Sequence, residues 1–140
     1  MKKLFLLLAI SAFVFSSCKK KDKDCSITEA NLVGSYKIIS VKYKASASSS
    51  EVDYTDQFLE PCEKDDLIIL NSDHTAAYSD VGTVCSPSGD DQGDWSLSGN
   101  ILTIDGDPSP LENFSCEGFT LTTTDFPSTG DKISINFKKQ

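Results

Sequence analysis

Arginine is absent from this 140-residue chain, so all 13 of its basic residues are lysines. Acidic residues number 21, which gives a net charge of −8 at pH 7. A nucleic-acid-binding protein needs a basic surface, and it usually needs arginine for bidentate contacts. The composition therefore excludes nucleic acid as a partner, and the acidic balance otherwise indicates solubility rather than a fold.

Histidine occurs once, as His74, and no two cysteines have C-x-x-C spacing. Zinc sites draw on clustered cysteine and histidine side chains, so we expect no metal. No glycine-rich phosphate loop is present, and we expect no cofactor. A catalytic nucleophile needs a base within hydrogen-bond reach, whereas His74 lies in an expected exposed turn. These scarcities leave little support for enzymatic chemistry.

Carboxylates offer the remaining candidates for chemistry. Asp65 and Asp66 are adjacent, as are Asp90 and Asp91. Neighbouring residues of a strand point to opposite faces, and in loops such pairs are usually solvated. The triplet Asp105-Gly106-Asp107 lacks the further ligands and the closing glutamate of a calcium-binding EF-hand loop. We therefore predict no catalytic residue, no metal ligand and a protein that is not an enzyme.

A long apolar run is also missing. The uncharged stretch from Leu4 to Phe15 is shorter than the roughly 20 residues of a membrane-spanning helix. Two lysines precede it and small residues follow, which is typical of a cleaved export signal over residues 1–17. The sequence Phe15-Ser16-Ser17-Cys18 resembles the lipobox of bacterial lipoproteins. That resemblance implies that Cys18 begins the mature chain and carries lipid, including an acyl chain such as palmitate. Ordinary secretory cleavage, leaving a spare thiol, is the alternative.

Residues 18–31 are predicted to link the lipid to the folded part. The stretch 19–24 is Lys-Lys-Lys-Asp-Lys-Asp and should be a solvated tether. Lysine and aspartate after a lipobox cysteine also resemble signals that send lipoproteins to the outer membrane surface of some Gram-negative bacteria. A plain hydrophilic linker, or attraction to an anionic leaflet, would look the same. We expect an anchor in the outer membrane, with the domain periplasmic or surface-exposed.

Removing residues 1–17 leaves 11 basic and 21 acidic residues, a net charge of −10. The part after the tether is long enough for one domain with one core, predicted over residues 32–140. Four cysteines remain beyond Cys18, and an even number in an oxidising compartment indicates two disulfides. Three pairings are possible. Spacing within the first hairpin described below favours Cys62 with Cys85, which leaves Cys25 with Cys116.

Short runs of β-branched and aromatic residues between turn residues predict strands, and no long helical pattern occurs. The first hairpin joins Leu67–Leu70 to Thr75–Tyr78 through residues 71–74, with Leu67 opposite Tyr78. This pairing brings Cys62 and Cys85 close enough for a disulfide. In the run from Tyr36 to Tyr43, the adjacent Ile38 and Ile39 leave the facing of the strand open.

The second hairpin is the clearest local signal. Its strands, Trp95–Ser98 and Ile101–Ile104, flank Gly99-Asn100, which suits a primed two-residue turn. The register pairs Trp95 with Ile104 and Leu97 with Leu102 on one face, which should be core. Three more strands are expected at Phe114–Cys116, Phe119–Thr123 and Ile133–Phe137. The predicted fold class is all-β, an antiparallel meander of about eight strands that is either closed as a barrel or stacked as a β-sandwich.

A family resemblance favours the barrel. The segment Leu32-Val33-Gly34-Ser35-Tyr36-Lys37-Ile38 resembles the L-x-G-x-W-x-[LI] opening of lipocalin-like domains, with Tyr36 in place of tryptophan. Later segments, Asp65 to Thr75 between Cys62 and Cys85 and then Gly93 to Ile104, are similar to small lipocalin-like domains of bacterial lipoproteins. The resemblance spans Leu32 to Phe137. The last strand departs from the family because it has no arginine to close the barrel base.

The resemblance implies a cavity that binds a small apolar molecule. Candidate wall residues are Tyr36, Trp95, Leu97 and Leu102, although residues of this kind are more often ordinary core. In the linker 44–65, the apolar residues Val52, Tyr54, Phe58 and Leu59 predict a short helix or lid, acting either as a gate or as a plug. Tyr54 and Phe58 join the ligand-binding candidates.

Two functions remain open. One is a lipid-anchored carrier or sensor, because an eight-stranded barrel can hold one small ligand. The other is a cavity-free module that binds an envelope or host protein or a glycan through the acidic loops around Asp90-Asp91 and 105–107. We expect a monomer attached to the membrane through Cys18. The sequence slightly favours the carrier.

Overall fold

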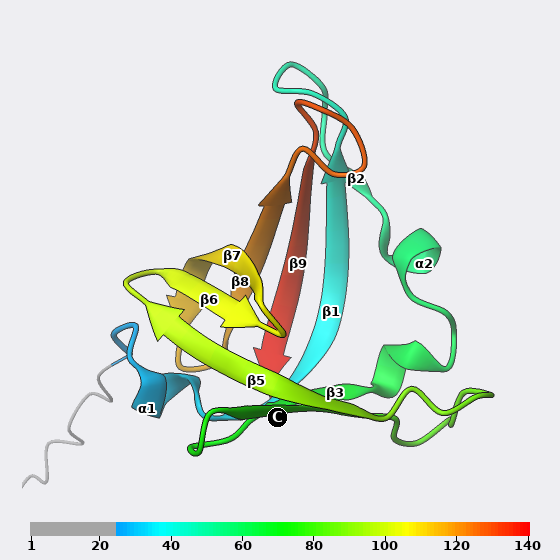
Figure 1. Ribbon diagram of the computed structural model, residues 1–140. Helices are drawn as coiled ribbons and strands as arrows, with labels where there is room; N and C mark the ends of the chain where they lie inside the picture. The colour runs from blue at the N-terminus through cyan, green and yellow to red at the C-terminus, as the bar shows by residue number, and fades with distance from the viewer. Residues whose placement is uncertain (1–24) are drawn as a thin grey trace, which may run out of the picture.

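The computed structural model describes residues 25–140 and shows a single antiparallel sheet closed into a barrel (Figure 1). The export signal, Cys18 and residues 19–24 lie outside the described residues. The strands are β1 (Gly34–Lys44), β2 (Val52–Asp53), β3 (Leu67–Leu70), β4 (Thr75–Ser79), β5 (Asp91–Ser98), β6 (Ile101–Ile104), β7 (Asp107–Ser115), β8 (Gly118–Thr124) and β9 (Lys132–Lys139). Two short helices, α1 (Glu29–Leu32) and α2 (Thr55–Phe58), and a 3-10 turn, η1 (Glu63–Asp65), complete the described chain.

Pairing between the first and last long strands closes the barrel. β1 pairs with β9 from Tyr36 opposite Lys139 to Lys44 opposite Lys132. From β3 to β9 each strand pairs with the next along the chain, and β3 pairs with β1. The two-residue β2 adds only to the outer part of β1. The described residues therefore form a closed barrel of eight strands, which confirms the predicted fold and excludes the sandwich.

The second hairpin has the predicted register, with Trp95 opposite Ile104 and Leu97 opposite Leu102. Gly99 has a φ of +61°, which a primed turn requires at its first position and which glycine adopts without strain. Trp95 is 2% exposed and Leu102 is fully buried. This face is therefore core, as the alternation of apolar residues predicted.

The first hairpin differs from the prediction by one residue. Ile68, not Leu67, stands opposite Tyr78. The backbone N–H of Asn71 donates to the carbonyl of Thr75, so the loop holds three residues rather than four. His74 ends that loop in the left-handed region with a φ of +69°, as three-residue hairpin loops require. The shift places Ile68 and Leu70 on the inner face.

β7 is longer than the predicted strand Phe114–Cys116, because Pro108 and Pro110 concealed its first half. The N–H of Leu111 donates to Asn100, so odd-numbered residues of this stretch bond to β6 and the proline nitrogens face β8. Pairing between β7 and β8 starts only at Leu111. The prolines therefore occupy positions where no ladder hydrogen bond is lost.

A β-bulge in β1 determines which of Ile38 and Ile39 points into the barrel, a question that the sequence left open. The register to β9 shifts between Ile38 and Ser40. Ile38 packs against the core, whereas Ile39 is 56% exposed. The extra residue restores the inward alternation further along the strand, where Val41 is fully buried.

One end of the barrel is closed by α1 and a packed aromatic cluster. The hydroxyl of Tyr36 donates to the carbonyl of Leu32 over 2.7 Å, and both side chains are buried. The ring of Tyr36 lies 4.8 Å from that of Phe119, which stacks on Phe137. We call this the closed end; it also carries the hairpin turns 71–74, 99–100 and 116–117.

Lys139 of β9 completes the closed end. Its ammonium donates to the carbonyls of Asn31 and Val33 over 2.9 and 2.6 Å, and it lies 5.4 Å from the centre of the Tyr36 ring. The lysine stem crosses directly over Gly34, where a Cβ atom would overlap it. Tyr36 thus stands where the family resemblance led us to expect tryptophan, and Lys139 of the last strand places a cation over its ring.

A disulfide fastens the N-terminal segment to the closed end. Cys25 is bonded to Cys116 in the β7–β8 turn, with Cα atoms 5.1 Å apart. Residues 25–31, which the sequence grouped with the tether, are therefore attached to the barrel. The other disulfide joins Cys62 and Cys85, as hairpin spacing favoured. Within residues 25–140, no helix has the length and apolar character needed to cross a membrane.

Candidate functional site

The end opposite α1 is bordered by four connections between antiparallel strands. They comprise residues 45–66, 80–90, 105–106 and 125–131. In Figure 1 the first and last of these reach the top of the molecule, and α1 lies at the bottom. We call this the open end, and α2 lies in the first of its four connections.

A pocket of about 390 Å³ lies at the open end, and we call it the mouth pocket. Residues of β8 and β9 form one part of it, and the start of β7, the end of α2 and the connection after β8 form the rest. Its lining residues are Phe58, Asp107, Pro108, Ser109, Thr123, Phe126, Ile133 and Ile135. The lining is mostly apolar, with one charged group.

The structure separates the ligand-binding candidates into two groups. Tyr36, Trp95 and Leu102 are at most 2% exposed and belong to the packed core, and Leu97 packs against it. None of these four lines the mouth pocket. Phe58 does line it and is 39% exposed, so it is the candidate that lies at the site.

Tyr54 lies beside the pocket rather than in it. Its N–H donates to the carbonyl of Val41, and its ring packs 5.5 Å from that of Tyr43. The hydroxyl of Tyr43 donates to Asp131 in the 125–131 connection. Tyr54 therefore helps to fix the start of α2, and through it the position of Phe58, relative to β1.

Leu59 plugs part of the open end. It is 8% exposed and borders a smaller pocket of about 190 Å³ with Ile38, Ile68 and Tyr78. Phe58, its neighbour, points to the larger mouth pocket. The predicted helix of the linker is thus present as α2, with a buried residue directly after it and a half-exposed aromatic ring at its end.

Sequence reasoning missed most of the pocket lining. Ile133 and Ile135 lie in the predicted strand Ile133–Phe137, but they were not among the candidate walls. Their position at the start of a strand, next to the open end, is the signal that could have identified them. Phe126, 57% exposed in a turn-rich segment, carried no such signal.

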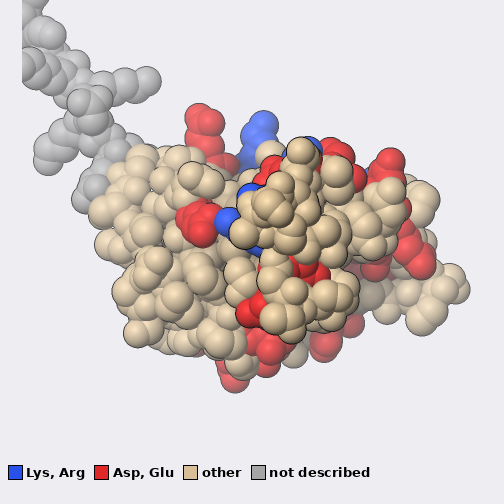
Figure 2. All heavy atoms as spheres, turned by 90° about the horizontal axis from the view of Figure 1, so that it is seen from above, with Lys and Arg blue, Asp and Glu red and all other residues tan. Residues whose placement is uncertain are grey.

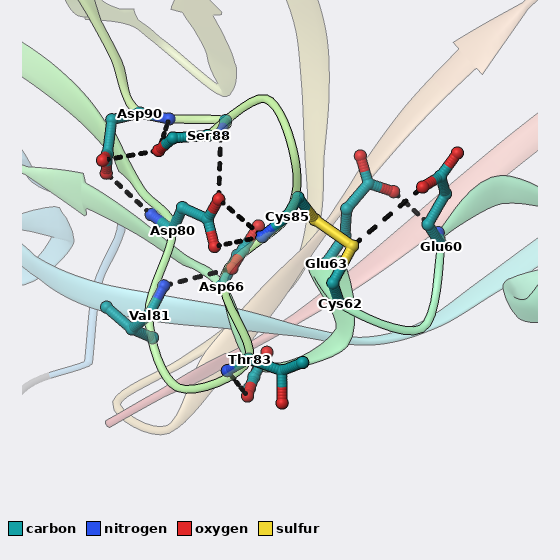
Figure 3. The surroundings of a disulfide bond; sticks show 12 residues. Glu60, Cys62, Glu63, Asp66, Asp80, Val81, Thr83, Cys85, Ser88 and Asp90 are labelled. Carbon is teal, nitrogen blue, oxygen red and sulfur yellow. Dashed lines mark hydrogen bonds between the residues drawn. A yellow bond between two sulfur atoms is a disulfide. The ribbon is translucent and has the colours of Figure 1, made fainter.

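Carboxylates hold the 80–90 connection in place (Figure 3). Asp80 accepts hydrogen bonds from the N–H groups of Cys85 and Gly89, over 3.0 and 2.9 Å. Asp90 accepts from the N–H of Asp80 over 2.9 Å. The Cys62–Cys85 disulfide ties the same connection to the residues before η1. The loop is therefore fixed by backbone hydrogen bonds and one covalent link.

The adjacent Asp65 and Asp66 support the same loop. Asp65 accepts from the N–H of Thr83 over 2.9 Å, and Asp66 accepts from the N–H of Val81 over 3.3 Å. The expectation that such pairs are merely solvated was wrong for these two, because they take up N–H groups that the turn leaves unpaired. Within the part of the chain that the structure describes, Asp65 and Asp66 therefore have a structural role.

Asp66, Asp80 and Cys85 approach one another closely enough to suggest a metal site. The sulfur of Cys85, however, is bonded to Cys62 and is not a thiolate. Both carboxylates already accept backbone hydrogen bonds. The donor set therefore does not fit a metal ion, and we assign none there.

Burial raises the pKa of Asp66, and the negative charges of Asp80, Asp65 and Glu63 add to the effect. The ionised carboxylate is thus less stable in the folded chain than in the unfolded chain. We expect Asp66→Asn to raise the melting temperature at pH 7, because an amide oxygen still accepts from Val81 without carrying charge. The gain should vanish below about pH 3.9, where the unfolded side chain is also neutral.

Asp73→Asn provides a matched control of opposite sign. Hydrogen bonds from Thr75 lower the pKa of Asp73, so its charge stabilises the folded chain above the unfolded pKa. This variant should lower the melting temperature at pH 7. Thermal melts followed by circular dichroism at pH 3 and pH 7 measure both differences. A lower melting temperature for Asp66→Asn at pH 7 would contradict the assignment.

Besides Asp107, a second carboxylate lies near the open end, that of Asp105 in the β6–β7 turn. Asp105 has a φ of +52°, and its N–H donates to the carbonyl of Asp94. Its carboxylate lies over Gly93, where any Cβ atom would overlap it. Burial raises the pKa of Tyr78 to about 12, and the charges of Asp105, Asp91 and Asp107 contribute. Acidic groups therefore gather on this side of the open end.

His74 lies at the closed end, away from the mouth pocket. Its ring is 5.3 Å from that of Trp95, and its Nε2 is 3.3 Å from a carboxylate oxygen of Glu29. The indole N–H of Trp95 donates to Asn71 in the same hairpin. His74 is thus an exposed turn residue, as predicted, packed against the base of the barrel.

Comparison with known proteins agrees with this architecture. A family model described as a lipocalin-like domain matches residues 32–139, which is nearly the whole barrel. No curated protein matches the chain.

Proposed function

Because this chain belongs to the lipocalin-like domain family, we propose that it binds a small apolar ligand at the mouth pocket while anchored to the cell envelope through a lipid on Cys18. The barrel and the family fit a role in small-ligand binding. Lipid anchoring, the outer membrane location and the absence of catalysis are parts of the proposal. The part of the proposal that concerns residues 1–24 is based on their sequence alone.

The mouth pocket is the observation that carries the proposal. Its volume of about 390 Å³ lies at the lower end of the range for small-molecule sites. Aromatic and branched side chains line it, and such surfaces gain free energy when a ligand removes them from water. The closed end is filled by Tyr36, Trp95 and Leu102. A ligand would therefore occupy only the outer half of the barrel.

The position of the N-terminal segment gives the proposal an orientation. Cys25 is bonded to the closed end, and it lies seven positions after Cys18 in the sequence. A chain of that length spans at most about 24 Å. A lipid on Cys18 would hold the closed end near the membrane, so the mouth pocket would open away from the anchoring leaflet. Ligand exchange would then take place with the aqueous side or with another envelope component.

The same geometry supports a binding protein rather than an enzyme. His74 lies at the opposite end from the pocket, and the carboxylates of Asp65 and Asp66 support a loop. A catalytic base must reach the proton that it abstracts. Among the described residues that line the pocket, Asp107 alone is ionisable. We do not assign it the role of a base that activates a nucleophile.

Native mass spectrometry tests the proposal. We would export the mature chain as Cys18→Ser, so that it is soluble, and expose it to a lipid extract of the cell envelope. The proposal predicts a reproducible small adduct that is lost on denaturation. Phe58→Glu should abolish the adduct, because it replaces the aromatic ring against which the apolar part of a ligand packs with a charged group.

Val84→Glu is the matched control. Val84 is 62% exposed in the 80–90 connection and does not line the mouth pocket, so this variant should keep the adduct. A bare mass across repeated extracts would overturn the carrier role and redirect the search to protein or glycan partners. An adduct that Phe58→Glu retains would overturn the assignment to this pocket.

A further inference from the structure

The charge at the mouth pocket is of one sign. Asp107 is the only charged residue in its lining, and the side chain is exposed. Within residues 25–140, the Asp107 carboxylate takes part in no hydrogen bond or ion pair. Its charge is therefore not neutralised by a neighbouring side chain, although it faces an apolar surface.

Two further carboxylates lie on the same side. Asp105 extends over Gly93 from the β6–β7 turn, two residues before Asp107. Asp91 stands opposite Tyr78 in the β4–β5 pair. The charges of all three carboxylates help to raise the pKa of Tyr78, so each lies within electrostatic reach of that residue. The three groups form an acidic wall, which we define as Asp91, Asp105 and Asp107.

Of the four lysines near the open end in the described part of the chain, three pair with acidic residues outside the wall, and the fourth, Lys44, ends β1. Lys42 pairs with Asp53 over 2.8 Å, Lys64 with Asp56 over 2.6 Å, and Lys132 with Glu112 over 3.5 Å. Figure 2 looks at the molecule from above Figure 1, and basic side chains appear only in the upper part of that face. Acidic side chains appear in both halves of that face, and its lower half shows no basic side chain. The local field thus favours a positively charged ligand.

We propose that the mouth pocket selects cationic amphiphiles, whose apolar part packs against Phe58, Phe126 and Ile133 while a single ammonium group pairs with Asp107. This inference rests on the proposed function and specifies the class of its ligand. An apolar body alone would fill the pocket but leave the acidic wall unpaired. A carboxylate or phosphate head would be repelled by the same wall.

Three ligands with the same chain and different heads test the inference: decylammonium, decanol and decanoate. Isothermal titration calorimetry on the Cys18→Ser mature chain, at low salt and below micelle-forming concentrations, gives their affinities. Decylammonium should bind about fivefold more tightly than decanol, the upper end for a solvent-exposed ion pair. Decanoate should bind most weakly, and the preference should shrink as salt is added.

Asp107→Asn should remove most of the preference for decylammonium and leave decanol binding unchanged. Glu117→Gln is the control with the same change in net charge, because Glu117 lies in the β7–β8 turn at the closed end. It should preserve the preference. If both variants reduced it equally, attraction to the acidic protein as a whole would explain binding, and the inference would be overturned.

The outcomes separate this inference from the function on which it rests. Equal affinity for the three ligands would overturn cationic selection while supporting an apolar binding pocket. Failure of all three to bind would overturn the proposed function itself. Selective binding of decylammonium that depends on Asp107 supports both.

Discussion

Replacing Cys25 and Cys116 with serine is expected to lower the free energy of unfolding by about 4.5 kcal/mol. The disulfide joins residues 91 positions apart, and closing so long a loop removes much of the conformational entropy of the unfolded chain. The two serines also release the segment before α1 from the β7–β8 turn. Equilibrium unfolding in guanidinium chloride, without reductant, measures the loss.

The second disulfide supplies the comparison. Cys62 and Cys85 are 23 positions apart, so their replacement by serine should cost about 3.5 kcal/mol. The order of the two losses is the sharper prediction, because the same chemical change is made in both. A larger loss from the Cys62 and Cys85 pair would contradict loop closure as the main source of stability. It would point instead to the network around Asp80.

Lys139→Met is expected to lower the free energy of unfolding by about 3 kcal/mol. Two hydrogen bonds from a charged donor to the carbonyls of Asn31 and Val33 are lost, together with the ammonium above Tyr36. Methionine keeps the length and apolar stem of the side chain. The loss therefore reports on the charged head that holds α1 to the barrel. The same denaturant titration measures it.

Lys139→Arg is the matched control, because arginine keeps the charge and the donors. It should cost much less than Lys139→Met, since a planar guanidinium can also lie over an aromatic ring. Equal losses would contradict the stabilising role of the charged head, because arginine keeps the charge and methionine does not.

The alternation of apolar residues predicted most of the barrel. The hairpin around Gly99-Asn100 has the predicted register, and its core face is buried. Turn chemistry succeeded there because glycine fixes the loop length. In the first hairpin, a histidine in the left-handed region shortened the loop by one residue. Such a backbone state is rare for non-glycine residues, and the sequence did not signal it.

Contacts between residues far apart in the sequence could not be predicted from local sequence patterns. The first half of β7 escaped prediction because prolines are usually excluded from sheets, yet here their nitrogens face positions where the ladder ends. Lys139 stands at a position that only barrel closure brings next to Tyr36.

For the same reason, the lining of the mouth pocket could not be predicted from the sequence. Its lining comes from four segments that the chain separates widely: α2, the start of β7, the end of β8 with the turn after it, and β9. The sequence identified Phe58, the aromatic residue of the predicted lid. The wall candidates chosen for their clear alternation, such as Trp95, proved to be core because clear alternation marks the best-packed part of a sheet.

Methyl NMR tests most directly whether the open end of this barrel holds an apolar ligand. Decanol and decylammonium would be titrated into the Cys18→Ser mature chain labelled at isoleucine and leucine methyl groups. Saturable shifts should centre on Ile133 and Ile135, while Leu70 and Leu102 at the closed end stay unchanged. Shifts centred on the closed end, or no saturable shift with either ligand, would contradict binding at the mouth pocket.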